Sequence, residues 1–297
     1  MKISTHDNGW TAIVEDIKLQ EANDMDAQMI GHLIADKTVV VFRNQNLTAS
    51  EETAFCAKIG KVESYSQRMA EAAQAELDEA GEKLYDKMLG ILEPETEHGS
   101  VIRVTAEHDD HGRPGLFGHA TDLDWHCNQS ANEWRDPIVW LYGIRGTAGS
   151  RTSWINTILA YNDLSDELKK EYADIKTING YSAEKGYSDE VFAKPEDINT
   201  SWTPNIVHTN IAGHTGLYFP FLQMHQVVGM NKADSKEFII KVRDHLLQEK
   251  YMYHHDWQDG DVVISEQWLG LHKRWHCDTM DQRVLHRICF NFDHIKF

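Results

Sequence analysis

Two histidines of this 297-residue chain stand in patterns that could bind a metal ion. His126 lies in the tetrapeptide Trp125-His126-Cys127-Asn128, and His272 follows a strand expected at 261–265. Two imidazoles and one oxygen ligand on one face of a ferrous ion leave the opposite face open for oxygen chemistry. Each histidine alone is weak evidence, because the chain has 17 of them and most histidines are surface or satisfied core residues. The order and spacing of the whole set carry more information.

Two arginines follow His272 at spacings of eleven and fifteen residues, as Arg283 and Arg287. A planar guanidinium donates two parallel hydrogen bonds to a carboxylate, so such residues suit an organic acid better than lysines do. The simpler alternative is that both form surface ion pairs, since 47 acidic residues against 29 basic ones give a net charge of −18. Arg287 opens the apolar stretch Ile288-Cys289-Phe290, which favours a buried position.

These residues resemble the taurine dioxygenase-like (clavaminate synthase-like) family of iron(II)- and 2-oxoglutarate-dependent oxygenases. LDWHCNQS at 123–130 resembles its first metal motif, normally Trp-His-x-Asp, and HKRWHCDTMDQRVLHR at 272–287 resembles its distal histidine with two arginines. Three more stretches carry the likeness: VVVFRNQNLT at 39–48, GTAGSRTSW at 146–154 and WQDGDVVIS at 257–265. The resemblance covers nearly the whole chain, apart from 68–91 and 181–202.

The resemblance implies an enzyme that uses Fe(II), 2-oxoglutarate as cosubstrate and O2. It assigns the metal to His126, Asn128 and His272. It assigns the far carboxylate of the cosubstrate to Arg283 and the Thr152 hydroxyl, and it turns Arg287 toward the keto-acid end or the substrate. No side chain beyond the metal centre receives a catalytic role. Activity is expected to be the hydroxylation of a C–H bond in a small polar molecule, such as an amino acid or a sulfonate.

Asn128 departs from the pattern, because the family has aspartate there. A neutral amide oxygen is a much poorer ligand for iron than a carboxylate, and the nearby acids Asp122, Asp124 and Glu133 do not obviously replace it. Three hypotheses stay open. The first is an oxygenase with Asn128 as a weak ligand. The second is a 2-oxoglutarate-dependent halogenase with chloride at the metal, since halogenating relatives carry Ala or Gly at this position. The third is a non-catalytic ligand-binding protein.

Other side chains receive weaker assignments. Tyr65 and Ser66 are placed like the substrate-contacting segment of the family. Asp122, Phe219 and Phe221 are further candidates for substrate binding. Ordinary core or loop packing is the alternative for each. Cys127 is expected to point away from the metal, because alternate residues of an extended segment face opposite sides. The remaining histidines of the motif regions are not expected to be ligands: His254, His255, His276 and His286.

The elements that must position these residues are mostly short strands. Apolar, β-branched stretches predict strands at 38–43, 138–142, 152–155, 206–209, 216–219, 261–265 and 287–292. Thr48 with Glu51 forms a capping box for a helix, and further helices are expected at 165–172 and 234–248. Residues 181–202 have no clear period and predict a surface loop.

This pattern predicts a mainly β fold, a double-stranded β-helix (jelly roll) with peripheral α-helices. One domain is expected over 1–297, with a helical insertion at about 68–91 that is either a lid over the site or a solvated helix.

Composition excludes several classes of protein. The negative charge disfavours nucleic-acid and anionic-membrane partners, and no run of eighteen apolar residues exists. Four cysteines without a CxxC pair disfavour a structural zinc site. Because the N-terminal segment has no apolar run after its lysine, a cytoplasmic protein with reduced thiols is expected. The partner should be a small-molecule substrate, and a homo-oligomer stays open.

Overall fold

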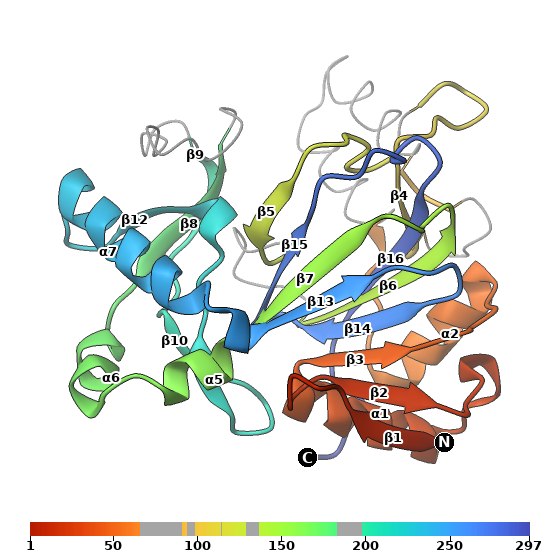
Figure 1. Ribbon diagram of the computed structural model, residues 1–297, viewed down its shortest axis with the longest axis horizontal. Helices are drawn as coiled ribbons and strands as arrows, with labels where there is room; N and C mark the ends of the chain where they lie inside the picture. The colour runs from red at the N-terminus through yellow and green to blue at the C-terminus, as the bar shows by residue number, and fades with distance from the viewer. Residues whose placement is uncertain (66–90, 94–98, 114, 129–136, 183–197) are drawn as a thin grey trace.

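The computed structural model describes residues 1–65, 91–93, 99–113, 115–128, 137–182 and 198–297 (Figure 1). The helical insertion expected at 68–91 lies outside these residues except for its last position. Ser66 and Glu133 also lie outside them.

Two β-sheets form the central part of the molecule (Figure 1). All strand pairs in them are antiparallel except β2 with β3. The seven-stranded sheet has the order β1 (Lys2–Thr5), β2 (Ala12–Glu15), β3 (Val39–Phe42), β14 (Val262–Glu266), β6 (Ile138–Arg145), β16 (Val284–Phe290), β4 (Ile102–Thr105). The four-stranded sheet has the order β13 (Met252–Asp256), β7 (Arg151–Asn156), β15 (Gly270–Arg274), β5 (Leu123–His126).

The inner faces of these two sheets pack against each other. One cluster of buried side chains joins them, with Val41, Leu141 and Val263 from the larger sheet and Trp154 and Tyr253 from the smaller one. Strands β14 and β16 are buried along their whole length, because both of their faces are covered. Each strand accordingly contains consecutive apolar residues, Val262–Ile264 in β14 and Ile288–Phe290 in β16, and not a strict alternation.

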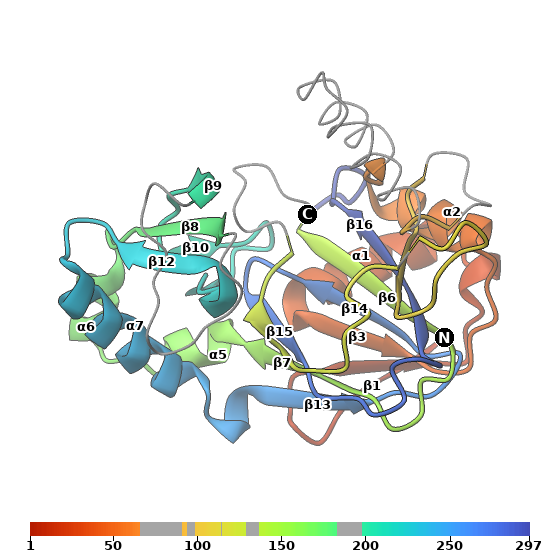
Figure 2. The ribbon, with the colours of Figure 1, turned by 90° about the horizontal axis from the view of Figure 1, so that it is seen from above.

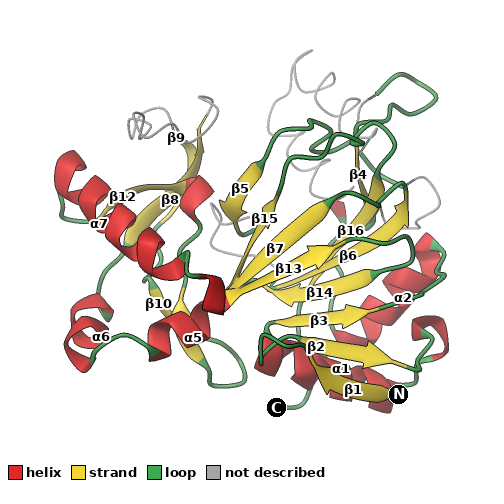
Figure 3. Ribbon diagram, viewed as in Figure 1, coloured by secondary structure: helices red, strands yellow, loops and turns green. Residues whose placement is uncertain are grey.

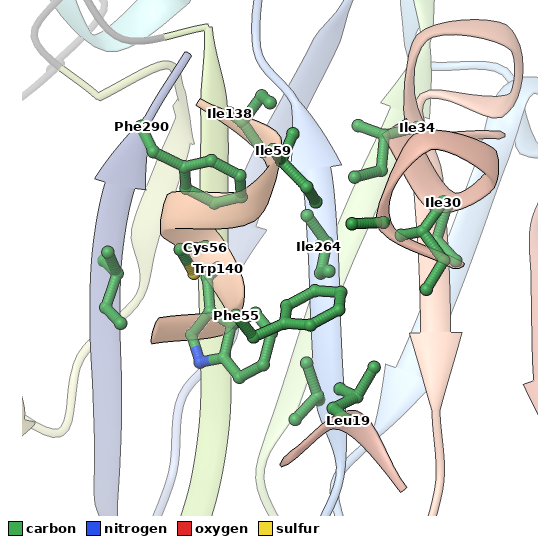
Figure 4. Packing of buried hydrophobic residues seen from close by; sticks show 14 of the residues in the cluster. Leu19, Ile30, Ile34, Phe55, Cys56, Ile59, Ile138, Trp140, Ile264 and Phe290 are labelled. Carbon is green, nitrogen blue, oxygen red and sulfur yellow. The ribbon is translucent and has the colours of Figure 1, made fainter. Parts of the chain in front are cut away.

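Two helices cover the outer face of the seven-stranded sheet: α1 (Asp24–Lys37) and α2 (Ala49–Ile59), preceded by a short 3-10 turn, η1 (Leu19–Glu21). Figure 4 shows the helix side chains Ile30, Ile34, Phe55, Cys56 and Ile59 packed against Trp140 of β6, Ile264 of β14 and Phe290 of β16. Burying one such large apolar side chain stabilises the fold by roughly 1.5–3 kcal/mol.

A second group of elements lies against the outer face of the four-stranded sheet (Figures 2 and 3). Its core is continuous with Trp125, Ile155 and Leu271 of that sheet. Its helices are α5 (Thr157–Asn162), α6 (Asp166–Tyr172) and α7 (Lys232–Leu246), with 3-10 turns η3 (Phe221–Gln223) and η4 (Glu249–Tyr251). Its strands are β8 (Thr177–Ser182), β9 (Ile198–Trp202), β10 (Val207–Thr209), β11 (Thr215–Leu217) and β12 (Met224–Val227).

The structure confirms most of the expected elements, and the fold is mainly β. Thr48 and Glu51 form the predicted reciprocal capping box at the start of α2. The surface loop predicted over 181–202 is wrong at both ends, since 181–182 belong to β8 and β9 runs over 198–202. These two strands form by pairing with each other. Local periodicity in the sequence does not predict such a contact between separate segments. His272 follows β14, as expected, and lies within the next strand, β15.

Candidate metal centre and its buried arginines

Strand pairing brings His126 and His272 together. β5 and β15 are antiparallel neighbours, and these two residues are direct partners in the register. Their ring centroids are 4.1 Å apart, and both side chains are buried. His272 also lies opposite Trp154 of β7, with the two rings stacked at 6.5 Å. Two residues 146 positions apart in the chain therefore present adjacent imidazoles to the space between the sheets.

Both imidazoles are held in the neutral state that a metal ion requires. Burial lowers the pKa of His126 to about 4 and holds the pKa of His272 well below its ordinary value. Nδ1 of His126 is 2.6 Å from the carbonyl oxygen of Asp124, so Nδ1 carries the proton and Nε2 keeps its lone pair. Nδ1 of His272 is buried and has no hydrogen-bond partner among the described residues.

Asn128, the third ligand expected from the sequence, is buried, and two contacts fix its position. Its N–H donates to Oε1 of Gln267 at 2.8 Å, and its side-chain Nδ2 lies 3.9 Å from Sγ of Cys289. Within the described part of the chain, no group of three His, Cys, Asp or Glu residues could hold a metal ion. The two histidines fit iron as nitrogen ligands, and Asn128 can add only an amide oxygen.

The acids near the motif are engaged elsewhere. Asp122 and Asp124 lie 2.9 Å and 3.4 Å from Nζ of Lys273, and Asp122 also accepts a hydrogen bond from the backbone N–H of His276. Cys127 points away from the two imidazoles, as predicted, with Sγ donating to the carbonyl oxygen of Gln267 at 3.1 Å. The four histidines not expected to be ligands each contact a carboxylate: His254 with Glu249, His255 with Asp261, His276 with Asp278 and His286 with Glu52.

Arg283 is almost completely buried, with 1% of its surface exposed. Its Nε donates to Oγ of Ser150 at 3.2 Å, and its Nη1 lies 3.8 Å from Sδ of Met280. Burial, with a contribution from the positive charge of Arg274, lowers the pKa of Arg283 to about 10, so it remains a cation at neutral pH. It forms no ion pair with any carboxylate of the described residues. A buried cation in this state can bind an anionic ligand strongly.

Thr152, on β7, lies two residues beyond Ser150, the residue that accepts the hydrogen bond from Arg283. Its Oγ1 accepts a hydrogen bond from Nε1 of Trp257 at 2.9 Å. The hydroxyl proton of Thr152 is then available for a second acceptor. Thr152 is also the register partner of Arg274 on β15.

Arg287 projects from β16 between two aromatic rings. The centre of its guanidinium is 5.6 Å from the ring of Tyr65 and 5.8 Å from the ring of Phe117. Nη2 donates to Oη of Tyr65 at 3.2 Å, while Nε is buried without a partner. Among the described residues, no carboxylate forms an ion pair with Arg287. This rules out the surface-ion-pair alternative for both arginines within that part of the chain.

The expected substrate-binding residues fall in different places. Tyr65 contacts Arg287, and its hydroxyl lies 3.2 Å from Sγ of Cys289. Phe219 and Phe221 are buried in the core cluster on the outer side of the four-stranded sheet, where their rings meet at 5.2 Å. That location favours the packing alternative for the two phenylalanines. Asp122 lies in the partly exposed ion pair with Lys273.

Two residues beside the site have no role in the sequence-based assignment. Gln267 fixes the backbone of Asn128, and nothing local marks a single glutamine after a strand as a positioning residue. Arg274 is buried two residues after His272 and therefore on the same face of β15. That spacing is a signal that could have identified Arg274 from the sequence.

Two buried, neutral histidines lie side by side between two mainly antiparallel sheets, and the buried Arg283 and Arg287 form no ion pair with any carboxylate of the described residues. The sequence matches the family described as "Taurine catabolism dioxygenase TauD, TfdA family" over residues 4–289, so the chain belongs to this family. It is an enzyme of the alpha-ketoglutarate-dependent dioxygenase class, which uses Fe(II), 2-oxoglutarate and O2.

Individual relatives agree with this class. The alpha-ketoglutarate-dependent 2,4-dichlorophenoxyacetate dioxygenase of Cupriavidus pinatubonensis is 26% identical over 292 residues, covering 94% of this chain and 93% of the relative. The pentalenolactone F synthase of Streptomyces arenae is 22% identical, covering 66% and 71%. The crystal structure of AAD-2 in complex with Mn(II) and N-oxalylglycine shares the fold, with a TM-score of 0.71 and 16% identity, covering 97% and 96%. No helix in the described part of this chain is long and apolar enough to cross a membrane.

Proposed function

We propose that this enzyme couples the oxidative decarboxylation of 2-oxoglutarate to the hydroxylation of a C–H bond in a small organic anion. One domain spanning 1–297 carries the reaction, and its two sheets form a double-stranded β-helix (jelly roll). In the balanced reaction, 2-oxoglutarate, O2 and R–H give succinate, CO2 and R–OH. The observation that carries the proposal is the pair of neutral imidazoles, His126 and His272, 4.1 Å apart beside buried cations without carboxylate partners.

The metal centre is formed by His126, His272 and Asn128. Nε2 of His126 is the ligand atom, because Nδ1 is committed to the carbonyl of Asp124. Asn128 contributes its amide oxygen, and the contact of its backbone N–H with Gln267 keeps the side chain in place. Iron with bound 2-oxoglutarate activates O2 for attack on an unactivated C–H bond. The residues of the chain supply binding, orientation and a buried setting.

Each of the two buried arginines binds a different anionic group. Arg283 and the Thr152 hydroxyl bind the far carboxylate of 2-oxoglutarate, while its keto-acid end binds the metal. Arg287 is then available for a second anion, because its buried Nε has no acceptor among the described residues. A carboxylate or sulfonate of the substrate is that second anion, with Tyr65 beside it. The relative named for 2,4-dichlorophenoxyacetate is consistent with an acidic substrate.

Hydroxylation is preferred over the two other hypotheses. The relatives include several named dioxygenases, which gives no support to a halogenase. The same names favour an enzyme over a non-catalytic ligand-binding protein, which would also use buried arginines to bind an organic anion.

The direct test is anaerobic reconstitution with Fe(II), followed by addition of O2 and 2-oxoglutarate, with succinate measured by mass spectrometry. A panel of small carboxylates and sulfonates should include members that raise succinate formation and gain one oxygen atom. His272→Ala is the matched inactive control, and His276→Ala, at an exposed histidine four residues away, should behave as wild type. Absence of succinate from the wild-type protein, with and without the panel, would refute the proposed activity.

A further inference from the structure

Arg274 is a buried cation that contacts main-chain oxygens instead of a carboxylate. Its Nη1 donates to the carbonyl of Phe117 at 2.6 Å. Its Nη2 donates to the carbonyls of His119 and Thr121 at 2.7 Å and 2.8 Å. Nε is buried without a partner, and 5% of the residue is exposed. One guanidinium therefore holds three carbonyls of the segment that leads into β5 and its metal motif.

The other side of this segment is pressed against β4. Leu116 forms two backbone hydrogen bonds with that strand, to the carbonyl of Arg103 at 2.9 Å and from the N–H of Thr105 at 3.2 Å. Gly118 approaches so closely that an added Cβ would lie 2.6 Å from Cα of Ala106. The segment is thus clamped between β4 and Arg274, with Phe117 in the middle.

Phe117 has a backbone conformation that needs such a clamp. Its φ is +53°, in the left-handed region that a phenylalanine adopts only at a cost of about 1–3 kcal/mol. The surrounding structure must supply that energy, and the short bond from Arg274 to the Phe117 carbonyl is the contact best placed to do so. In this conformation the ring of Phe117 lies against the guanidinium of Arg287.

Arg274 also reaches the other end of the site. Its Nη1 lies 4.0 Å from Sδ of Met280, and Nη1 of Arg283 lies 3.8 Å from the same sulfur. Thr152 is its neighbour across the strand pair. Arg274 therefore adds a second positive charge beside the side chains proposed for the far carboxylate of 2-oxoglutarate.

We propose that Arg274 is a positioning residue that joins the two ends of the site. Its planar fork holds residues 117–121 so that Phe117 stays over Arg287, and its charge strengthens the binding of a dianion at Arg283. The second part rests on the proposed function, while the first part does not. Lysine could retain the charge but not the fork, since its single ammonium lacks the fixed, planar set of donors.

Two substitutions separate these roles, Arg274→Lys and Arg274→Met. The matched controls are Arg151→Lys and Arg151→Met, at an arginine of the adjacent strand β7 whose ion pair with Asp256 is exposed. Hydrogen exchange of the backbone amides is measured by mass spectrometry for 115–121 and, as an internal reference, for β6. Calorimetry with the Mn(II)-loaded protein measures the Kd for 2-oxoglutarate, so neither readout depends on turnover.

Both Arg274 variants should speed exchange at 115–121 by about tenfold or more, because each loses charge-assisted hydrogen bonds. Exchange in β6 should stay unchanged. The Kd for 2-oxoglutarate should rise by about tenfold in Arg274→Met and by less than about threefold in Arg274→Lys, since lysine keeps the charge. Neither Arg151 variant should change either readout.

Three results would overturn the inference. Wild-type exchange at 115–121 in Arg274→Lys would show that the fork does not hold the segment. Faster exchange throughout β6 in both variants would show a general structural role. An equal Kd in wild type and Arg274→Met would remove the electrostatic part. If the wild-type protein itself binds no 2-oxoglutarate, the proposed function fails, and the exchange measurement still decides the positioning role of Arg274.

Discussion

His126 and His272 are direct partners across the β5–β15 strand pair, and this pairing alone sets their rings 4.1 Å apart. Register in a sheet is all-or-none for a side chain, because a shift by one residue turns it to the opposite face. The placement of the two imidazoles is therefore as stable as the pairing of two short strands. Asn128 lies beyond the end of β5, and its position depends on the contact with Gln267.

The histidine pair predicts a pH dependence of stability. Burial lowers the pKa of His126 to about 4, whereas an unfolded chain has a histidine pKa near 6.5. Between these values the unfolded state binds the proton and the folded state does not. The free energy of unfolding of the metal-free protein should therefore fall as pH decreases from 6.5 towards 4, with a limiting slope of about 1.4 kcal/mol per pH unit. Urea titrations across this range measure the slope, and His126→Gln should reduce it. An equal slope in that variant would contradict the assignment.

Asn128→Asp should tighten iron binding by restoring a charged ligand. A carboxylate brings a full negative charge to a divalent ion, whereas the amide of Asn128 brings only a dipole. Equilibrium competition with a chelator should show a Kd for Fe(II) at least about tenfold lower, equivalent to roughly 1.4 kcal/mol. The product should remain hydroxylated in both proteins. Equal iron affinity in the two proteins would mean that the side chain at 128 does not touch the metal.

Arg283→Ala should raise the requirement for 2-oxoglutarate strongly. The far carboxylate would lose its buried charged partner, at a cost of about 3–5 kcal/mol. Arg283→Lys should recover part of the loss, because charge returns without the planar fork. Steady-state kinetics should show the loss as a higher KM for 2-oxoglutarate. An unchanged KM in Arg283→Ala would assign the far carboxylate to another residue.

His286, on the outward face of β16 beside Arg287, predicts the opposite pH dependence. Burial alone would lower its pKa, but the hydrogen bonds to Glu52 at 2.7 Å and Glu93 at 3.5 Å raise it to about 9. The buried state of Glu52 raises the pKa of that carboxyl too, and we take the charged pair as the folded form because Trp140 also donates to Glu52. The contribution of protonated His286 to the free energy of unfolding should be complete below pH 6.5. It should disappear as pH rises through 9.

The free energy of unfolding of the wild-type protein should therefore be lower at pH 10 than at pH 6. This decrease should be absent in His286→Gln. The expected loss is of the order of 1–3 kcal/mol, as one pKa unit corresponds to about 1.4 kcal/mol. A larger loss in the variant than in the wild type would exclude His286 as its source.

The sequence predicted the parts of the site that depend on chain order. The spacing from His272 to the two arginines, the Trp-His-x-Asn motif and the capping box at Thr48 are all local patterns, and local chemistry is enough to interpret them. The apolar stretches at 261–265 and 287–292 likewise predicted strands, which the structure has as β14 and β16. Asn128 was identified as the departure from its family because residue type alone decides whether a ligand carries charge.

Only the tertiary structure decided which side chains share a face and which lie together. Phe219 and Phe221 pack on the outer side of the sheet that carries His126 on its inner side, and no local signal distinguishes the two sides. Gln267 reaches Asn128 across 139 positions of the chain, and Arg274 holds three carbonyls about 155 positions away. Such contacts arise from strand register and from the packing of distant segments. Their energies depend on burial and on partners that a residue acquires only when the whole chain has folded.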